Sequence, residues 1–200
     1  MNRLAGACGL AFALGVLPGW PQVIEFESNG LKYQTLTKSA VTVMYASLPA
    51  RLHSYVVIQV AVSNGSQGPY IIRPEDFTFV RSDGDAVRAA SADSVVQMIS
   101  QKGARTDLLK LVDDYEAALY GVRTTRSTNG YEQRREAALL FGPAKLRAAA
   151  EASAVALVKT KLAAGESTDG AVFFPASGKP LGPGRLLVRT NTDTFEFKPD

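Results

Sequence analysis

The spacing of apolar residues changes twice along this chain, and this change constrains the fold more than any other feature. Residues 22–90 form short β-type runs, residues 91–164 carry helical spacing, and residues 170–197 return to β-type runs. An isolated pair of strands is marginal in water, so the C-terminal strands need partners. The strands of residues 22–90 are the simplest partners. The pattern therefore predicts one β domain interrupted by a helical insertion at about 91–164.

The first β region contains the strongest strand signals. The run Tyr55–Val62 is rich in β-branched residues, as expected of a central strand with a buried face. Asn29-Gly30 predicts a tight hairpin turn, because both positions tolerate a positive φ. Further short strands are expected at residues 23–26, 31–37, 40–46, 70–72 and 77–80.

The middle region carries the signals of three or four helices. Ser91 is a candidate N-cap for the first, and Pro143 suits the start of the last, expected over residues 144–164 with Gly165 as its C-cap. A helix over residues 108–120 would place five apolar side chains on one face: Leu108, Leu111, Val112, Tyr115 and Leu119. Another helix is expected over residues 131–140.

The C-terminal region adds strands at residues 170–174, 186–188 and 195–197. This series of short strands with frequent turns predicts an antiparallel β-sandwich. The fold class expected is mainly β, with the helical insertion packed on one end or edge of the sandwich.

The N-terminus has the form of an export signal. Arg3 precedes a run of 14 residues, Leu4 to Leu17, with no charged or polar side chain. A membrane span needs about 20 apolar residues, whereas a shorter run suits a signal peptide. We expect a signal peptide at residues 1–19 and a single domain at residues 20–200, exported to the periplasm or outside the cell. The alternative is a lipoprotein acylated at Cys8, but Leu4 stands one position too far from Cys8 for a lipobox.

The composition excludes several kinds of site. One Cys and one His exclude multi-cysteine metal sites and two-histidine motifs. His53 and Ser54 are neighbours, but no nearby pattern completes a catalytic triad. Two acidic clusters, Asp113-Asp114 with Glu116 and Asp83-Gly84-Asp85, are possible calcium ligands, but solvated surface charge is favoured for both. We expect no catalytic residue, no metal and no cofactor.

Positive charge is concentrated in the helical block. Residues 101–165 carry 11 basic and 7 acidic side chains, whereas the regions on either side each have a net charge of −1. Such an excess can attract an acidic partner, a phosphate backbone or an anionic membrane. The predicted partner-binding residues are Arg123, Arg126, Tyr131, Arg134 and Arg135. The alternative is that these arginines pair with Glu132, Glu136 and Glu151 along the helices.

Two stretches of the chain resemble a known group of proteins. The first is Val62-Ser63-Asn64 followed by Ile72-Arg73-Pro74-Glu75-Asp76-Phe77, and the second runs from Leu162 through Gly170 and Phe173-Phe174-Pro175 to Phe195-Glu196-Phe197. These motifs are similar to those of uncharacterised exported bacterial proteins with an immunoglobulin-like, telokin-like β-sandwich. The resemblance implies that fold for the β parts, and it brings no catalytic residues with it.

These observations predict a non-enzymatic exported domain that binds a protein or a cell-envelope surface. After signal removal no transmembrane span is expected. The alternatives are a binder of nucleic acid or anionic membrane through the basic helical block, and an enzyme whose site the sequence does not reveal.

Overall fold

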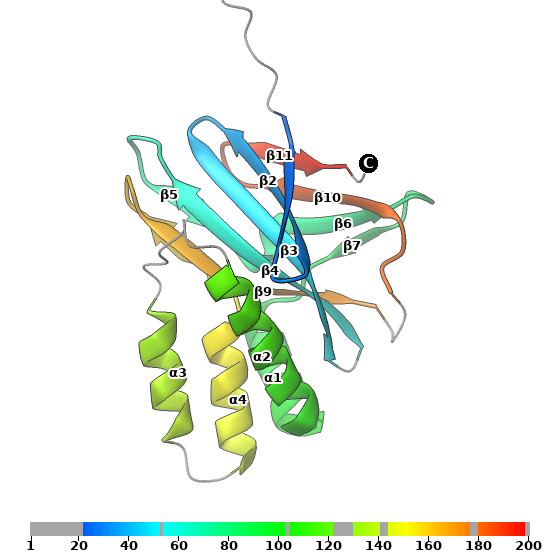
Figure 1. Cartoon of the computed structure of the whole chain (residues 1–200), viewed down its shortest axis with the longest axis vertical. Helices are drawn as coiled ribbons and strands as arrows, with labels where there is room; N and C mark the ends of the chain where they lie inside the picture. Colours follow the sequence, from blue (N-terminus) through cyan, green and yellow to red (C-terminus); the bar gives the residue numbers. More distant parts are fainter. Residues whose placement is uncertain are drawn as a thin grey trace, which may run out of the picture.

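The structure is a computed structural model that describes residues 22–52, 54–102, 105–121, 130–140, 144–176 and 180–198. Within these residues the chain is mainly β, with antiparallel sheets and four α-helices (Figure 1). The helices follow the first seven strands and precede the last four, as the change in spacing predicts.

The largest sheet has five strands in the order β1-β2-β3-β4-β9. Its strands are β1 (Ile24–Ser28), β2 (Leu31–Lys38), β3 (Val41–Leu52), β4 (Tyr55–Asn64) and β9 (Ser167–Pro175). The turn predicted at Asn29-Gly30 joins β1 to β2, with φ of 50° and 73°. A second two-residue turn, Ser39-Ala40, joins β2 to β3 and also has positive φ at both positions.

The second sheet has four strands in the order β11-β10-β6-β7. Its strands are β6 (Phe77–Arg81), β7 (Ala86–Arg88), β10 (Gly184–Arg189) and β11 (Thr194–Phe197). Strand β10 pairs with β6, and β9 pairs with β4 along its whole length. The prediction that the C-terminal strands pair with strands of residues 22–90 is therefore confirmed. A short pair, β5 (Tyr70–Ile72) with β8 (Thr160–Leu162), completes the β structure.

One hydrophobic core lies between the two larger sheets. It contains Val60 and Val62 of β4, Phe174 of β9, and Phe195 and Phe197 of β11, and all five side chains are fully buried. Alternate residues of each strand enter it, as the two-residue period of a strand requires. This arrangement of two antiparallel sheets fits a β-sandwich.

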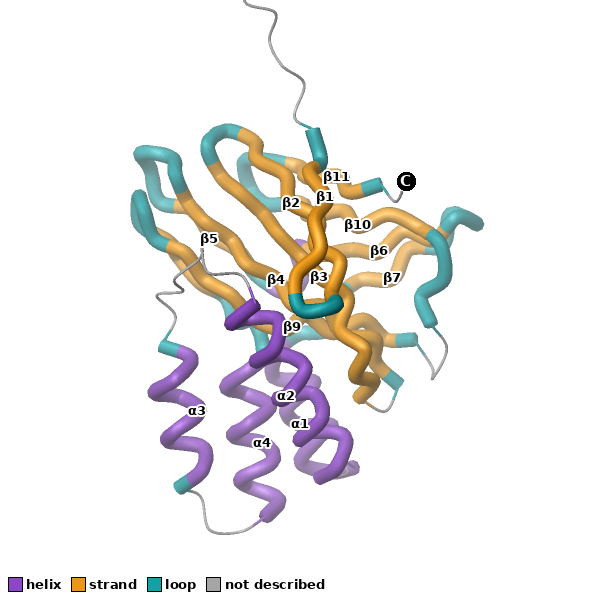
Figure 2. The backbone as a smooth tube through the Cα atoms, viewed as in Figure 1, coloured by secondary structure: helices purple, strands orange, loops and turns teal. Residues whose placement is uncertain are grey.

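The helices cover the opposite face of the five-stranded sheet. They are α1 (Ala92–Lys102), α2 (Arg105–Gly121), α3 (Tyr131–Leu139) and α4 (Ala144–Val155). A second core joins the predicted apolar face of α2 to residues of β2, β3, β4 and β9. The expected position on an end or edge is therefore wrong: Figure 2 shows the helices as a layer on one side of the strands. The sheet has apolar side chains on both faces, so the helices are needed to bury the second.

The last helix ends earlier than expected. α4 stops at Val155, and residues predicted as its final turns form β8 instead. The chain leaves the helix because Leu157 donates its N–H to Ala171 O, 2.9 Å away, along the outer edge of β9. A Cβ on Gly170 would lie 2.5 Å from the Cα of Leu157, so this approach requires glycine. Gly165 consequently lies in the turn before β9, with φ of 81°, and is not a helix cap.

The motifs of the resemblance have packing roles. Asp76 accepts a hydrogen bond from Arg73 N at 2.9 Å and closes the short turn that begins at Pro74, while Phe77 is fully buried. Asn64 is also fully buried, and its amide donates to the carbonyls of Gly68, Leu162 and Ala163. These side chains join neighbouring loops to the sheet.

Candidate functional site

The helical layer is the predicted site of recognition. Its inner part is α1, α2 and α4, and its outer part is α3, which packs mainly on α4. α2 packs against β3, and both α1 and α2 pack against α4. α3 lies beside α4 at one end of the row of helices (Figure 1). Leu109 and Tyr120 of α2 are 42 % and 57 % exposed. These two side chains are therefore available for contacts beyond the domain.

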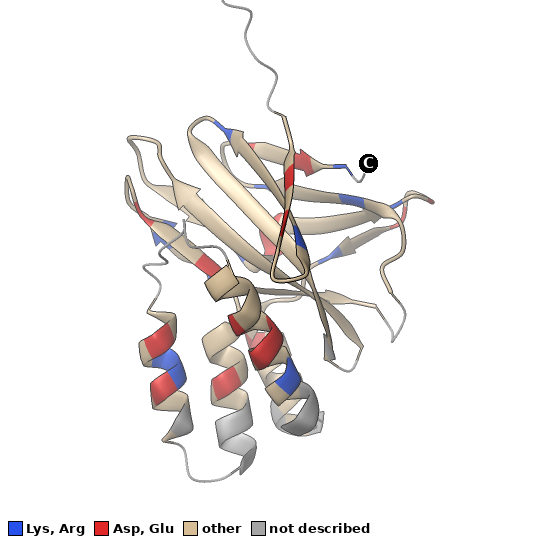
Figure 3. Cartoon of the chain, in the orientation of Figure 1, with Lys and Arg blue, Asp and Glu red and all other residues tan. Residues whose placement is uncertain are grey.

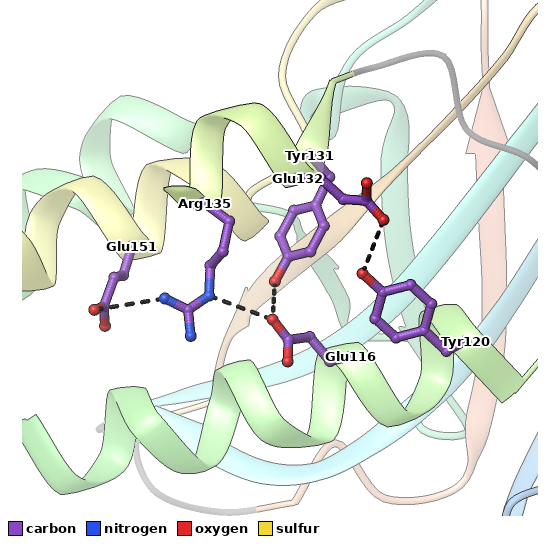
Figure 4. Close-up of polar contacts among 6 residues, drawn as sticks. All are labelled: Glu116, Tyr120, Tyr131, Glu132, Arg135 and Glu151. Atoms are coloured by element: carbon purple, nitrogen blue, oxygen red, sulfur yellow. Dashed lines mark hydrogen bonds and ion pairs between the residues drawn. The ribbon is translucent and has the colours of Figure 1, made fainter. Parts of the chain in front are cut away.

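A polar network joins α2, α3 and α4 (Figure 4). Tyr131 donates its hydroxyl to Glu116 Oε1 at 2.8 Å, and Arg135 Nε donates to the same oxygen at 3.3 Å. On its other side, Arg135 Nη1 lies 3.7 Å from Glu151 Oε1. Glu151 is only 5 % exposed, and a buried carboxylate is costly without an opposite charge nearby. Arg135 therefore compensates two carboxylates from two different helices.

The hydroxyl of Tyr131 stays protonated in this network. Burial and the hydrogen bond to Glu116 raise the pKa of Tyr131 far above its usual value. A neutral hydroxyl can only donate to the carboxylate, which fixes the direction of this hydrogen bond. A weaker contact of the same kind joins Tyr120 to Glu132 at 3.4 Å.

A second polar contact joins the helices to the sheet. The fully buried Tyr115 donates its hydroxyl to Asp169 of β9, which is itself buried. Burial, together with the charge of Asp169, raises the pKa of Tyr115 well above its usual value. The ring of Tyr115 lies 5.2 Å from that of Tyr131, so the two contacts belong to one continuous region.

These contacts show what the predicted partner-binding residues do within the chain. Tyr131 is 4 % exposed, and Arg135 is paired with carboxylates, so both serve to hold the helices together. The pairing of Arg135 with Glu151 is the alternative considered above for the helical arginines. Arg134 is half-buried on α3. Arg123 and Arg126 lie outside the described residues.

The acidic clusters considered for calcium have other surroundings. Asp83 Oδ1 accepts the N–H of Asp85, and Asp85 pairs with Arg81 at 3.1 Å, which stabilises the turn between β6 and β7. Among the residues that the structure describes, no group of three or more Asp, Glu, His or Cys side chains could hold a metal ion. His53 falls outside the described residues. An open hollow of about 420 Å³ lies beside the same turn, between Arg81–Asp83 and the loop 180–183.

Sequence analysis did not single out the exposure of β1. Every side chain of this strand is exposed or half-exposed, including Ile24 at 61 % and Phe26 at 36 %. Apolar residues alternate with Glu25 and Glu27, a pattern that normally indicates one buried face. Among the described residues, α2 reaches the end of this strand, where Ser28 Oγ donates to Gly121 O at 2.7 Å, but Ile24 and Phe26 remain exposed. The alternation in β1 therefore predicts a buried face, but the sequence alone does not show that no other described element covers Ile24 and Phe26.

Comparisons with known proteins do not place the chain in a family. No family model matches it, and no curated protein does. One similar solved structure is the yjhA protein from Bacillus subtilis, with 10 % sequence identity, coverage of 88 % of this chain and 96 % of that chain, and a TM-score of 0.38. No helix among the described residues is both long enough and apolar enough to cross a membrane.

Proposed function

We propose that this protein is a non-enzymatic domain, exported through its N-terminal signal, that binds a protein or cell-envelope partner. Its two sheets are assigned in this proposal to an immunoglobulin-like sandwich of the telokin-like kind. The sandwich supplies the rigid body, and the outer helical surface supplies the contact with the partner.

The position of α3 is the observation that carries this proposal. The face of the five-stranded sheet is covered mainly by α2, with α1 and α4 packed beside it, whereas α3 packs on α4. A helix used only as cover would lie against the sheet, where its apolar residues would be removed from water. α3 instead packs on α4 and is joined to α2 and α4 by contacts of Tyr131 and Arg135, and in the sequence it follows Arg123 and Arg126.

The test must keep the helical layer intact. Deleting the helices would expose buried residues of the sheet, such as Tyr33 and Phe173, and Arg135 is needed for its ion pairs. The informative variant therefore replaces Arg123, Arg126 and Arg134 with Gln and leaves Arg135 unchanged. A matched control replaces three exposed basic residues with Gln: Lys32 and Arg185 of the two sheets, and Lys198 directly after β11.

Both variants and the unchanged protein would be used to capture partners from a cell-envelope extract, and captured proteins would then be tested in purified form. We expect the helical variant to bind about tenfold more weakly, and the control to bind as the unchanged protein does. Equal binding by all three would contradict a role for the helical surface. Binding to DNA or anionic vesicles that falls with salt would favour the anionic-ligand alternative.

A further inference from the structure

The two edges of the five-stranded sheet are treated differently. At the β9 edge, Leu157 N donates to Ala171 O at 2.9 Å, and Ala90 N donates to Phe173 O at 2.8 Å. At the β1 edge, the strand pairs with β2 alone, and no backbone hydrogen bond among the described residues reaches its outer side. One edge is therefore closed by the chain itself, whereas the other retains its capacity for pairing.

The turn geometry shows which backbone groups of β1 point outwards. In a two-residue hairpin the residues that flank the turn exchange both hydrogen bonds, and here these are Ser28 and Leu31. Alternate residues then repeat this arrangement, so Phe26 is bonded to β2. The N–H and C=O groups of Glu25 and Glu27 lie between them and point away from the sheet. They form the two-residue pairing site of this edge.

The two faces of β1 differ in chemistry. On the helical side, the ring of Phe26 stacks on Tyr33, with centroids 5.0 Å apart and an interplanar angle of 6°, and Ile24 lies two residues away on the same face. On the opposite face, Gln34 of β2 donates its side-chain amide to Glu25, and Glu27 lies opposite Lys32 of β2. Figure 3 shows the acidic positions along this exposed strand.

We propose that β1 binds an extended polypeptide segment as a sixth strand, and that this segment alternates basic and apolar residues. Residues opposite Glu25 and Glu27 would share the acidic face, where Lys or Arg is complementary. The residue between them would share the face of Phe26, where an apolar side chain is complementary. This proposal rests on the proposed function, since it assigns a protein segment as the partner and β1 as an additional point of contact.

A second copy of the chain is a poorer occupant. Antiparallel pairing of two β1 strands about Phe26 would place Glu25 of each copy opposite Glu27 of the other. Like charges directly opposite one another destabilise a strand pair. Charged residues on an edge strand are a common protection against such self-association. The same carboxylates that oppose a second copy favour a basic strand.

The probe is a labelled peptide of roughly nine residues in which Lys and Val alternate, a length typical of a paired strand. One control peptide has Glu in place of Lys, and another has the lysine peptide's sequence with alternate amides N-methylated, which removes pairing without changing the side chains. Fluorescence anisotropy would measure binding to the full chain. We expect the lysine peptide to bind at least about tenfold more tightly than either control.

Two protein variants test the site itself. Glu25→Pro removes an outward N–H and leaves the hydrogen bonds to β2 in place, and we expect it to weaken binding about fivefold or more. Glu25→Lys with Glu27→Lys retains the backbone groups and should reverse the preference to the glutamate peptide. Circular dichroism checks that both variants are folded.

The proposal is overturned if the N-methylated peptide binds as well as the unmodified one, a result that needs no variant of the protein. It is also overturned if the lysine peptide does not bind, or if sedimentation shows that β1 variants alter only self-association. The proposed function fails separately, when envelope capture yields no partner. Loss of capture in the helical arginine variant with unchanged peptide binding would leave both proposals standing.

Discussion

The two faces of the five-stranded sheet are buried in different ways. The face towards the second sheet is filled by branched and aromatic side chains, such as Val43, Ile58 and Val172. The face towards the helices has smaller residues at its centre, including Ala46 and Ala61, and it buries the polar side chains of Gln59 and Asp169. Alanines let a helix approach closely, and hydrogen bonds from tyrosines then hold it in place. The first face depends on filled volume, whereas the second also depends on a few polar contacts.

Two neighbouring phenylalanines of β9, Phe173 and Phe174, test the two faces separately. Phe174 points into the core between the sheets, and Phe173 points towards the helices. Each substitution by Ala should reduce the free energy of unfolding by about 3–5 kcal/mol. We expect Phe174→Ala to reduce amide protection against hydrogen exchange throughout both sheets, and Phe173→Ala to reduce it first in the helices. Identical patterns of lost protection in the two variants would remove the distinction between the faces.

Gly170 tests the segment that passes from the helical layer to the core between the sheets. An added Cβ would meet the backbone of Leu157 at 2.5 Å, so Gly170→Ala should reduce the free energy of unfolding by about 1–3 kcal/mol. Gly68→Ala is a matched control, because nothing lies within 4 Å of its Cβ position and its φ is not in the left-handed range. Urea unfolding would measure both. A Gly170 variant as stable as the control would contradict this close approach.

Ion pairs on the two sides of the molecule should also differ. Arg135→Gln leaves Glu116 and the buried Glu151 without their cation, and we expect a loss of about 1–2 kcal/mol in the free energy of unfolding. Arg185→Gln breaks an exposed pair with Glu196 in the second sheet, and should change it by less than about 0.5 kcal/mol. Thermal unfolding of both variants at low and high salt gives the comparison. Equal small effects would show that the helical network contributes little to stability.

The smallest expected effect concerns alkaline pH. Burial and the nearby charge of Glu25 raise the pKa of Tyr45 from 10.0 to about 12. The unfolded chain therefore loses this proton at lower pH than the folded chain. The associated stability is complete below about pH 10 and is lost as the pH rises towards 12.

Tyr45→Phe should reduce the slope of stability against pH in that range, as urea unfolding at successive pH values would show. Tyr131→Phe is the comparison from the helical side, because the pKa of Tyr131 is also raised. An unchanged slope in the Tyr45 variant would indicate that its hydroxyl is more accessible to water than the structure shows.

The sequence predicted the order of elements and the return of the C-terminal strands, because hydrophobic spacing reports which residues must be buried. It did not predict where α4 ends, because alanine favours helix while the pairing of Leu157 with Ala171 is a tertiary contact. Nor did it distinguish Arg135, which pairs within the helical layer, from an arginine directed at a partner. That distinction depends on the position of Glu151, which spacing along one helix does not reveal.

Because β4 lies between β3 and β9, the sheet can be completed only late in the synthesis of the chain. This central strand lies between β3, which precedes it directly, and β9, where Tyr55 is opposite Pro175. During synthesis the first four strands emerge long before the ninth, so the sheet remains incomplete until nearly the whole polypeptide is available. Contacts between residues so distant in sequence also slow folding, since a long loop must close first. The central strand therefore stays only half paired during most of synthesis, which lengthens the interval in which chaperones can act on the chain.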